Sequence, residues 1–272
     1  MRSKLEALSG LERRGISTRG LLARLWALYF AHRPAVVLAM GLYLVLVHLA
    51  VLGLFWRSEW PGVVAWNLGL GARWVELDRY FGVQAAILRS QAAAVAPGAT
   101  LYIGDSQLAA VDIGALTDHA VQLSIVGETT RRARIRIGDY GPAMRHARLV
   151  FLHVGTNDLR WRPPEAIGRP LGRLLAKVPP GVPVIVSDIL PVDERVVRSY
   201  GNAQVLAANR IMARVCAQHP GCAFAETGAF LRDAGGGLDP RYHRGDGLHL
   251  SVEGQRVWRA ALMPVLPPWR SF

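Results

Sequence analysis

The chain has 272 residues, 51% of them hydrophobic, and a formal net charge of +12. This length is enough for one α/β domain with an extension or for two small domains. It excludes the class of small proteins that cannot bury a core of their own. A mean hydropathy of +0.20 is high for a soluble protein and indicates a membrane segment. The positive net charge is compatible with nucleic acid, an anionic membrane or an acidic substrate as the partner.

The basic charge is concentrated at the start of the chain, directly before an uncharged apolar run. Residues 1–34 contain Glu6 and Glu12 but seven basic side chains, namely Arg2, Lys4, Arg13, Arg14, Arg19, Arg24 and Arg33. Residues 35–56 contain no formally charged side chain, and a helix rising about 1.5 Å per residue would give them a length of about 33 Å. We therefore expect a transmembrane helix at residues 35–56 that contacts the lipid bilayer.

The excess of arginine before this helix predicts its orientation. Residues 1–34 should form a basic cytoplasmic or interfacial segment, and residues 57–272 should lie outside the cytoplasm, in the periplasm of a single-pass inner-membrane protein. A cleaved signal peptide is less favoured because the leader and the apolar run are too long and no A-x-A-like site follows. A buried globular helix is less favoured because the run has no polar face. Residues 21–30 form either an interfacial helix or an early start of the membrane helix.

The two cysteines, Cys216 and Cys222, flank a turn sequence that contains Pro220 and Gly221. This turn would let the ends of the segment meet, and a location outside the cytoplasm would permit a disulfide. Two unpaired buried thiols are the alternative. The cysteines and histidines lack zinc spacing, so we expect no metal site, and the sequence indicates no cofactor.

Beyond the apolar run, the sequence predicts a helical connector at residues 57–97 and an α/β domain at residues 98–272. Apolar strand patterns recur at residues 100–104, 121–126, 148–154, 182–188 and 222–225, and helical patterns at residues 107–117, 129–145, 164–178, 193–218 and 251–263. Alternation of this kind predicts a three-layer, flavodoxin-like parallel sheet with helices on both faces.

Polar residues follow several of these strands, at the edge where parallel sheets bind ligands. They are Gly104, Asp105 and Ser106 after the first strand, Gly127 after the second, Gly155, Thr156, Asn157 and Asp158 after the third, and Asp246 and His249 before the last helix. A serine hydroxyl needs a base to become nucleophilic, and an imidazole can take its proton near neutral pH. A carboxylate three residues before the imidazole can fix its tautomer, so the pattern favours nucleophilic catalysis by serine.

The same residues resemble the sequence blocks of the SGNH (GDSL-type) serine hydrolases over about residues 98–268. The first block, GDS, matches Gly104 to Ser106, the second-block glycine matches Gly127, the third block, GxND, matches Gly155 to Asp158, and the fifth block, DxxH, matches Asp246 to His249. The chain departs from the family at Gln107 and Leu108, which bears on the substrate-binding part of the site. The resemblance implies an SGNH-like catalytic domain at residues 98–272.

Resemblance and side-chain chemistry predict the same roles. The catalytic triad would be Ser106, Asp246 and His249, and the oxyanion hole would use the backbone N–H groups of Ser106 and Gly127 with the Asn157 amide. Gly104 would allow a tight turn, while a side chain at Gly127 could block the substrate. Asp105 and Asp158 are expected to be structural.

Each of these residues also has an ordinary alternative, such as a helix cap for Ser106 or a core histidine for His249. We expect a solvated helix face, or contact with lipid headgroups or an anionic glycan, for the basic cluster of Arg131, Arg132, Arg134 and Arg136. Structural or surface positions are expected for His146, His153, His219 and His243.

The predicted function is hydrolysis of a small acyl ester, such as an acetyl ester of a carbohydrate or lipid, through an acyl-serine intermediate. Two alternatives stay open. An O-acetyltransferase would pass the same acyl group to a cell-surface polysaccharide beside a multispanning acyltransferase partner. A non-catalytic subunit would scaffold a complex or bind glycan on the same fold. Nucleic acid is not expected as a partner, because the domain is predicted to lie outside the cytoplasm.

Overall fold

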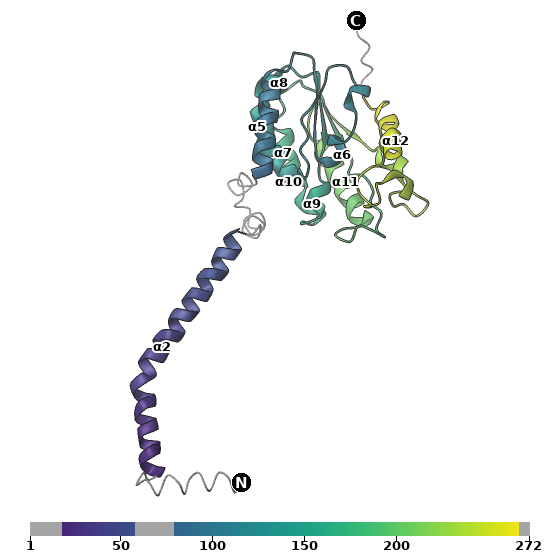
Figure 1. The fold of residues 1–272 in the computed structure, drawn as a ribbon. Helices are drawn as coiled ribbons and strands as arrows, with labels where there is room; N and C mark the ends of the chain where they lie inside the picture. The colour runs from purple at the N-terminus through teal and green to yellow at the C-terminus, as the bar shows by residue number, and fades with distance from the viewer. Residues whose placement is uncertain (1–17, 58–78, 267–272) are drawn as a thin grey trace. The chain divides into compact units, whose positions relative to one another are not determined.

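The computed structural model of the protein describes residues 18–57 and 79–266. The chain divides into two units, Met1–Trp74 and Val75–Phe272, which are described separately. The described part of the first unit is a single helix, α2 (Thr18–Arg57), drawn in purple in Figure 1. Residues 21–30 form the early part of this continuous helix.

The stretch Pro34–Gly53 of α2 is long and apolar enough to cross a membrane. Its side chains are exposed, with Leu38 at 75%, so this helix is not buried in a protein core. His48 donates its Nδ1 proton to the Leu44 carbonyl at 2.7 Å, one turn earlier. The imidazole therefore has a hydrogen-bond partner within α2 itself, as a polar group in an apolar segment needs.

The second unit is built on a parallel sheet of five strands in the order β2-β1-β3-β4-β5. The strands are β1 (Thr100–Gly104), β2 (Ala120–Gln122), β3 (Leu149–His153), β4 (Val184–Ser187) and β5 (Cys222–Ala225). The central strands β1, β3 and β4 are buried along their whole length, which explains their continuous apolar sequences. The predicted flavodoxin-like sheet is confirmed.

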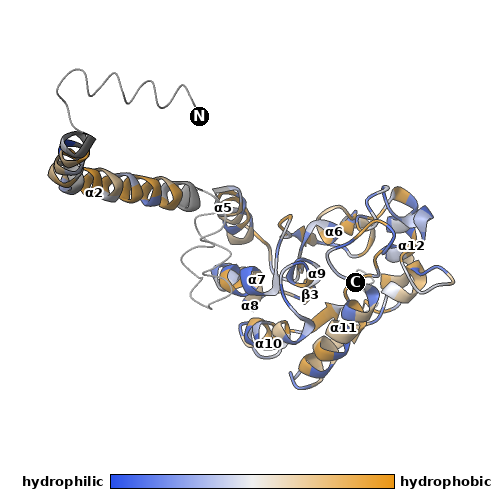
Figure 2. Cartoon of the chain, turned by 90° about the horizontal axis from the view of Figure 1, so that it is seen from below, coloured by the Kyte–Doolittle hydropathy of each residue, from blue (hydrophilic) through white to orange (hydrophobic). Residues whose placement is uncertain are grey.

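Helices cover both faces of this sheet. They are α5 (Arg79–Ala93), α6 (Ser106–Ala109), α7 (Thr130–Arg136), α8 (Gly141–Arg145), α9 (Thr156–Leu159), α10 (Gly168–Leu175), α11 (Asn202–Ala217) and α12 (Val252–Leu262). Short 3-10 helices lie at Ile113–Ala115, Ile137–Tyr140, Pro164–Ala166, Gly228–Leu231 and Pro240–Tyr242. Figure 2 shows α7, α10 and α11 along one side of the sheet and α6 and α12 along the other.

The core beneath α6 and α12 is apolar and aromatic. Trp258 of α12 is fully buried there with Leu108, Tyr102 and Phe151. Its indole N–H donates to the Thr227 hydroxyl at 2.8 Å, so burying this side chain leaves no polar atom of the ring unpaired. The packing fixes α12, and with it the loop that precedes α12.

The helix α5 packs on the outside of the second unit. Phe81 is 5% exposed, and the Arg132 guanidinium lies 4.9 Å from the centre of its ring. Arg89 forms an exposed ion pair of 2.7 Å with Asp139. The last part of the predicted connector therefore contacts the α/β domain, while residues 58–78 lie outside the described residues.

Three predicted helices differ from the observed ones. The pattern at residues 107–117 gives α6 and a short 3-10 helix, and the pattern at 129–145 is broken into α7, a 3-10 turn and α8. The helix predicted at 193–218 begins only at Asn202. Its start is set by Glu194, whose carboxylate accepts the Asn202 N–H, and by Gln204, whose side chain accepts the Gly201 N–H at 3.0 Å.

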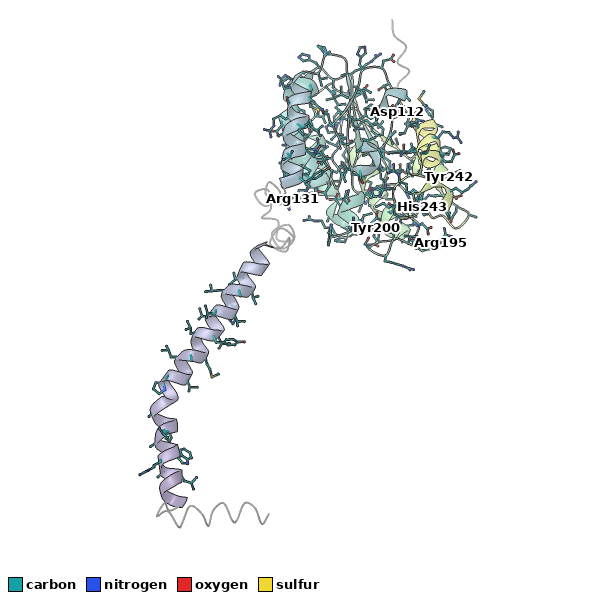
Figure 3. The ribbon with its side chains drawn as sticks, viewed as in Figure 1. Asp112, Arg131, Arg195, Tyr200, Tyr242 and His243 are labelled. Carbon is teal, nitrogen blue, oxygen red and sulfur yellow. A yellow bond between two sulfur atoms is a disulfide. The ribbon has the colours of Figure 1, made fainter. Side chains whose placement is uncertain are left out.

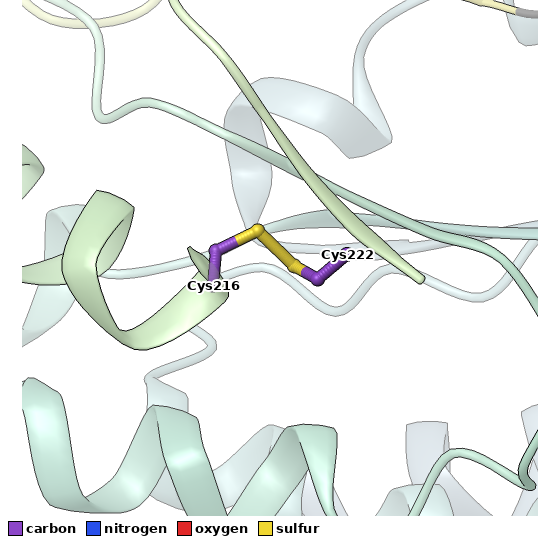
Figure 4. The surroundings of a disulfide bond; sticks show 2 residues. All are labelled: Cys216 and Cys222. Carbon is purple, nitrogen blue, oxygen red and sulfur yellow. A yellow bond between two sulfur atoms is a disulfide. The ribbon is translucent and has the colours of Figure 1, made fainter. Parts of the chain in front are cut away.

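Cys216 and Cys222 form a disulfide (Figure 4). The bond joins the last turn of α11 to the first residue of β5 across the predicted turn. The alternative of two buried free thiols is therefore wrong for this structure.

Candidate active site

Ser106 and His249 meet at the carboxyl edge of the sheet, although 143 positions separate them in the chain. Ser106 is the first residue of α6, separated from the end of β1 by Asp105 alone, and its Oγ lies 2.9 Å from His249 Nε2. His249 Nδ1 lies 2.7 Å from Asp246 Oδ2 in the loop before α12. With the ring proton on Nδ1, His249 donates to Asp246, and Nε2 accepts the hydroxyl proton of Ser106.

The Asp246 carboxylate is held by its own loop. Its Oδ1 accepts the backbone N–H groups of Leu248 at 3.0 Å and of His249 at 2.8 Å. Partial burial of the carboxyl acts to raise its pKa, but the hydrogen bonds from Leu248 and His249 outweigh it and lower the pKa of Asp246 below its ordinary value. Asp246 is therefore ionised at neutral pH and can stabilise an imidazolium.

The proposed oxyanion donors lie on neighbouring loops. The chain after β2 continues beside β1, with Leu123 N–H donating to Tyr102 at 2.7 Å and Ile125 N–H donating to Gly104 at 2.9 Å. Gly127, with a φ of +77°, follows two residues later. Among the described residues, the backbone N–H groups of Ser106 and Gly127 have no hydrogen-bond acceptor. Both are therefore able to donate to an oxygen of a bound substrate.

The Asn157 amide reaches the same loop from α9. Its Nδ2 donates to the Glu128 carbonyl at 3.0 Å, directly beyond Gly127. One of the two amide protons is used in this contact, and the second can be offered to a substrate oxygen. The structure thus brings Asn157 to the Gly127 loop, where the sequence analysis expected it.

Gly104 is needed for a reason other than the predicted tight turn. A Cβ atom at this position would lie 2.5 Å from the His153 carbonyl oxygen of β3, a distance that no real side chain tolerates. The glycine therefore lets β1 and β3 approach each other at the residue that precedes the Asp105–Ser106 pair. At Gly127, by contrast, a Cβ atom would meet nothing within 4 Å, and the positive φ is what favours glycine.

Asp105 and His153 lie next to each other inside the domain, with His153 Nε2 3.9 Å from Asp105 Oδ1. Both are 0% exposed, and the Asp105 side chain caps α6 by accepting the Gln107 N–H at 2.9 Å. Burial raises the pKa of Asp105 to about 7 and lowers the pKa of His153 to about 3, because each group loses the water that would stabilise its charge. The ring of His153 is therefore neutral, as the sequence-based assignment to a structural position requires.

Gln107, the departure from the family pattern, points inward. Its side chain is buried, with Oε1 lying 3.3 Å from His153 Nε2 and Nε2 donating to the Leu248 carbonyl at 3.2 Å. The residue thus connects α6 to the loop that carries His249. Gln107 therefore supports this loop.

Asp158 is 2% exposed and accepts both the N–H and the hydroxyl of Thr130 at 2.8 Å. Burial raises its pKa to about 6 against the effect of these bonds. Its contacts tie α9 to the start of α7, next to the Gly127 loop. This arrangement agrees with the structural position expected for Asp158.

The basic cluster on α7 is not uniformly solvated. Arg136 is 2% exposed and pairs with the fully buried Glu128, with Nε donating at 2.8 Å, and it also contacts the Tyr140 hydroxyl. The prediction of a solvated face is therefore wrong for Arg136. Its partner Glu128 follows Gly127, so this buried ion pair anchors the loop that carries a proposed oxyanion donor.

Sequence reasoning missed three supporting residues at this edge, which are Gln107, Glu128 and His243. Gln107 and His243 act through partners far away in the chain, Leu248 and Asp193, whereas Glu128 pairs with Arg136 eight residues later. A weak signal existed for His243, because it stands six residues before His249 in a segment that contains two glycines.

Among the described residues, no group of three or more metal-binding side chains could hold a metal ion.

The sequence of residues 96–257, more than half of the chain, matches the model of the GDSL-like Lipase/Acylhydrolase family. The chain belongs to this family. The prediction of an ester hydrolase of the SGNH/GDSL type is thereby confirmed. The comparison with curated proteins found none that matches the chain in sequence.

Solved structures of three bacterial proteins share the fold at low sequence identity. A Streptococcus pneumonia structure, described as a platelet activating factor, is 22% identical with a TM-score of 0.62, covering 74% of this chain and 98% of that one. A lipase/acylhydrolase from Enterococcus faecalis is 18% identical with a TM-score of 0.53, covering 64% and 100%. An acetylxylan esterase from Geobacillus stearothermophilus is 16% identical with a TM-score of 0.50, covering 61% and 94%.

Proposed function

We propose that this GDSL-like protein is a membrane-anchored serine esterase that removes small acyl groups, such as acetyl, from carbohydrate or lipid esters outside the cytoplasm. The observation that carries the chemistry is the chain of contacts from Ser106 Oγ to His249 at 2.9 Å and from His249 to Asp246 at 2.7 Å. The fold shared with an acetylxylan esterase supports the choice of a short acyl group.

In the first half of the reaction, the Ser106 oxygen attacks the ester carbonyl carbon while His249 Nε2 takes the hydroxyl proton. The carbonyl oxygen becomes an oxyanion, which would accept the N–H groups of Ser106 and Gly127 and an amide proton of Asn157. When this intermediate collapses, the C–O bond to the alcohol breaks, and His249 returns the proton to the leaving oxygen. The products are an acyl-serine at Ser106 and a free alcohol.

In the second half, a water molecule replaces the alcohol. His249 takes a proton from the water as its oxygen attacks the acyl carbon, and the same donors receive the second oxyanion. Collapse returns the proton to Ser106 Oγ and releases a carboxylic acid. Asp246 stays ionised throughout and holds the imidazole by its Nδ1–H.

Purified full-length protein in detergent micelles tests this function on a series of p-nitrophenyl esters from acetyl to dodecanoyl. We expect hydrolysis that is fastest for the shortest esters and that is lost in the Ser106→Ala variant. Equal rates for Ser106→Ala and the wild type would overturn the serine mechanism. A preference for dodecanoyl over acetyl would overturn the small-acyl assignment and leave the serine mechanism standing.

The proposed location rests on the apolar stretch of α2 and on the disulfide. Basic residues precede the stretch Pro34–Gly53, and cysteines bond most readily in oxidising compartments outside the cytoplasm. Protease added to spheroplasts of a Gram-negative host should digest the second unit and spare an N-terminal tag. Protection of the second unit until the membrane is lysed would contradict the proposed orientation.

Transfer to a sugar hydroxyl is a second outcome that the membrane helix makes worth testing, because it would use the same acyl-serine. The assay with p-nitrophenyl acetate is repeated with a panel of oligosaccharides, and the products are analysed by mass spectrometry. Free acetate alone supports the proposed hydrolase. Acetylated oligosaccharide formed in a Ser106-dependent manner would assign the protein as an O-acetyltransferase instead.

A further inference from the structure

A second histidine–aspartate pair lies beside the proposed triad. His243 Nε2 lies 3.2 Å from Asp193 Oδ2, and both side chains are only 6% exposed. His243 belongs to the loop before α12, and Asp193 belongs to the segment between β4 and α11. Neither residue takes part in the chemistry proposed above.

The hydrogen bonds of His243 fix the position of its proton. Its Nδ1 accepts two backbone N–H groups, from Gly245 at 3.0 Å and from Gly247 at 3.1 Å. A ring nitrogen that accepts hydrogen bonds carries no proton, so the ring proton is on Nε2 and is donated to Asp193. The neutral imidazole therefore bridges a carboxylate and two peptide groups.

Asp193 is a firmly held partner for this ring. Its Oδ1 accepts the Arg195 N–H at 3.0 Å, and the Arg195 guanidinium donates to both carboxylate oxygens, at 2.8 and 3.0 Å. These bonds to the Arg195 side chain are the main reason that the pKa of Asp193 is lowered to about 2. Figure 3 labels Arg195 and His243 close together at this edge of the second unit.

The two segments also join through their backbones. Asp193 N–H donates to the Gly247 carbonyl at 2.9 Å. Gly247 has a φ of +73°, and a Cβ atom there would lie 2.9 Å from Val196 Cβ, so only glycine allows this approach. The two ends of the loop at residues 243–250 are also joined to each other. His243 and Leu250 form an isolated antiparallel β-bridge, and Arg244 N–H donates to the His249 carbonyl at 2.9 Å.

The two peptide groups held by His243 stand on either side of Asp246. Fixing Gly245 and Gly247 therefore fixes the backbone from which the Asp246 carboxylate reaches His249. We propose that His243 is a positioning residue, whose Nδ1 holds this loop so that Asp246 and His249 stay aligned with Ser106. This inference rests on the proposed esterase function.

Two substitutions separate the two halves of the bridge. His243→Asn puts an amide oxygen about where Nδ1 lies and keeps an acceptor for Gly245 and Gly247, while His243→Gln puts an amide nitrogen about where Nε2 lies and keeps a donor to Asp193. His243→Ala removes both the acceptor and the donor.

A displacement of catalytic groups by about 1 Å can cost on the order of 100-fold in rate. We therefore expect kcat to fall about 10- to 100-fold in the Ala and Gln variants, with KM within about two-fold, and to be largely retained in the Asn variant.

Hydrogen–deuterium exchange of the full-length protein in micelles provides a readout that is independent of turnover. Peptides that cover residues 243–250 should exchange faster in His243→Ala and His243→Gln than in the wild type and His243→Asn. His146→Ala is the matched control, because His146 is an exposed histidine at the end of α8, and it should leave both kcat and exchange unchanged.

The outcomes separate this inference from the proposed function. Unchanged kcat and exchange in His243→Ala would overturn the positioning role, as would equal losses in the Asn and Gln variants. If the wild type shows no Ser106-dependent hydrolysis, the proposed function fails, while the exchange comparison still reports whether His243 holds the loop.

Discussion

The Asp246 carboxylate uses its two oxygens for different partners: Oδ2 lies 2.7 Å from His249 Nδ1, while Oδ1 accepts the His249 N–H at 2.8 Å. One residue thus orients both the ring and the backbone of the proposed base. The bond to Nδ1 determines which imidazole nitrogen faces Ser106, so catalysis should depend on the charge of Asp246 and not only on its shape.

Asp246→Asn should lower kcat by about 10⁴-fold, because the amide can stabilise the wrong tautomer of His249 and cannot stabilise an imidazolium. Steady-state hydrolysis of p-nitrophenyl acetate measures the effect. Asp112→Asn is the control, since Asp112 is an exposed carboxylate that pairs with Arg259 at 3.3 Å. A decrease below ten-fold for Asp246→Asn, or an equal decrease for Asp112→Asn, would speak against the triad.

Asn157→Ala should lower kcat by about 10²- to 10³-fold with a smaller change in KM, because an oxyanion donor acts mainly in the transition state. Asn157 also bonds the Glu128 carbonyl, so its loss could move the Gly127 loop as well. Asn209→Ala is the matched control, because this amide also bridges backbone groups, at Ile189, and is not one of the proposed oxyanion donors. If both variants lose the same stability and the same activity, Asn157 is a structural residue only.

Arg136→Ala should lower the free energy of unfolding by about 3–5 kcal/mol, because it leaves the carboxylate of Glu128 buried without its partner. The Arg136 and Glu128 side chains are 2% and 0% exposed. Urea unfolding followed by fluorescence measures the change. Arg89→Ala breaks the exposed pair with Asp139 and should cost less than about 1 kcal/mol. Similar costs for the two variants would contradict the assignment of a buried anchoring pair.

Asp105→Asn should change how stability depends on pH. The folded protein raises the pKa of Asp105 from 3.8 to about 7, so it binds the proton more tightly than the unfolded chain does. Wild-type stability therefore decreases, relative to the variant, as the pH rises from about 4 to about 7, and the difference is constant above that range. Urea unfolding at several pH values tests the sign. A difference that grows in favour of the wild type over this range would contradict a neutral, buried Asp105.

Much of the sheet was predictable because its strands are short, apolar and bounded by turn residues. The predicted strand at residues 100–104 coincides with β1, which follows Pro97 and Gly98, and the strand at 222–225 coincides with β5, which follows Pro220 and Gly221. The contact between Ser106, His249 and Asp246 was predictable for a related reason, since each of the three lies in a block that resembles the family pattern, next to a strand or helix end.

The errors arise where a side-chain contact that the sequence pattern does not reveal decides the local structure. The helix predicted at 193–218 starts late because Glu194 folds back onto the first turn of α11. Arg136 was assigned to a solvated face because nothing in the local sequence indicates that Glu128 is buried beside it. His243 had no partner in the sequence because Asp193 lies 50 residues away. Contacts of this kind follow from tertiary packing and leave no periodic signal.

The most direct test of the central claim is to react the full-length protein with a fluorophosphonate and to locate the adduct by peptide mass spectrometry. If Ser106 is the nucleophile that His249 activates, the wild type should carry one adduct at Ser106. Labelling should be absent in Ser106→Ala and at least about 100-fold slower in His249→Ala. Labelling of another residue, or labelling of Ser106 at the wild-type rate without His249, would contradict the account.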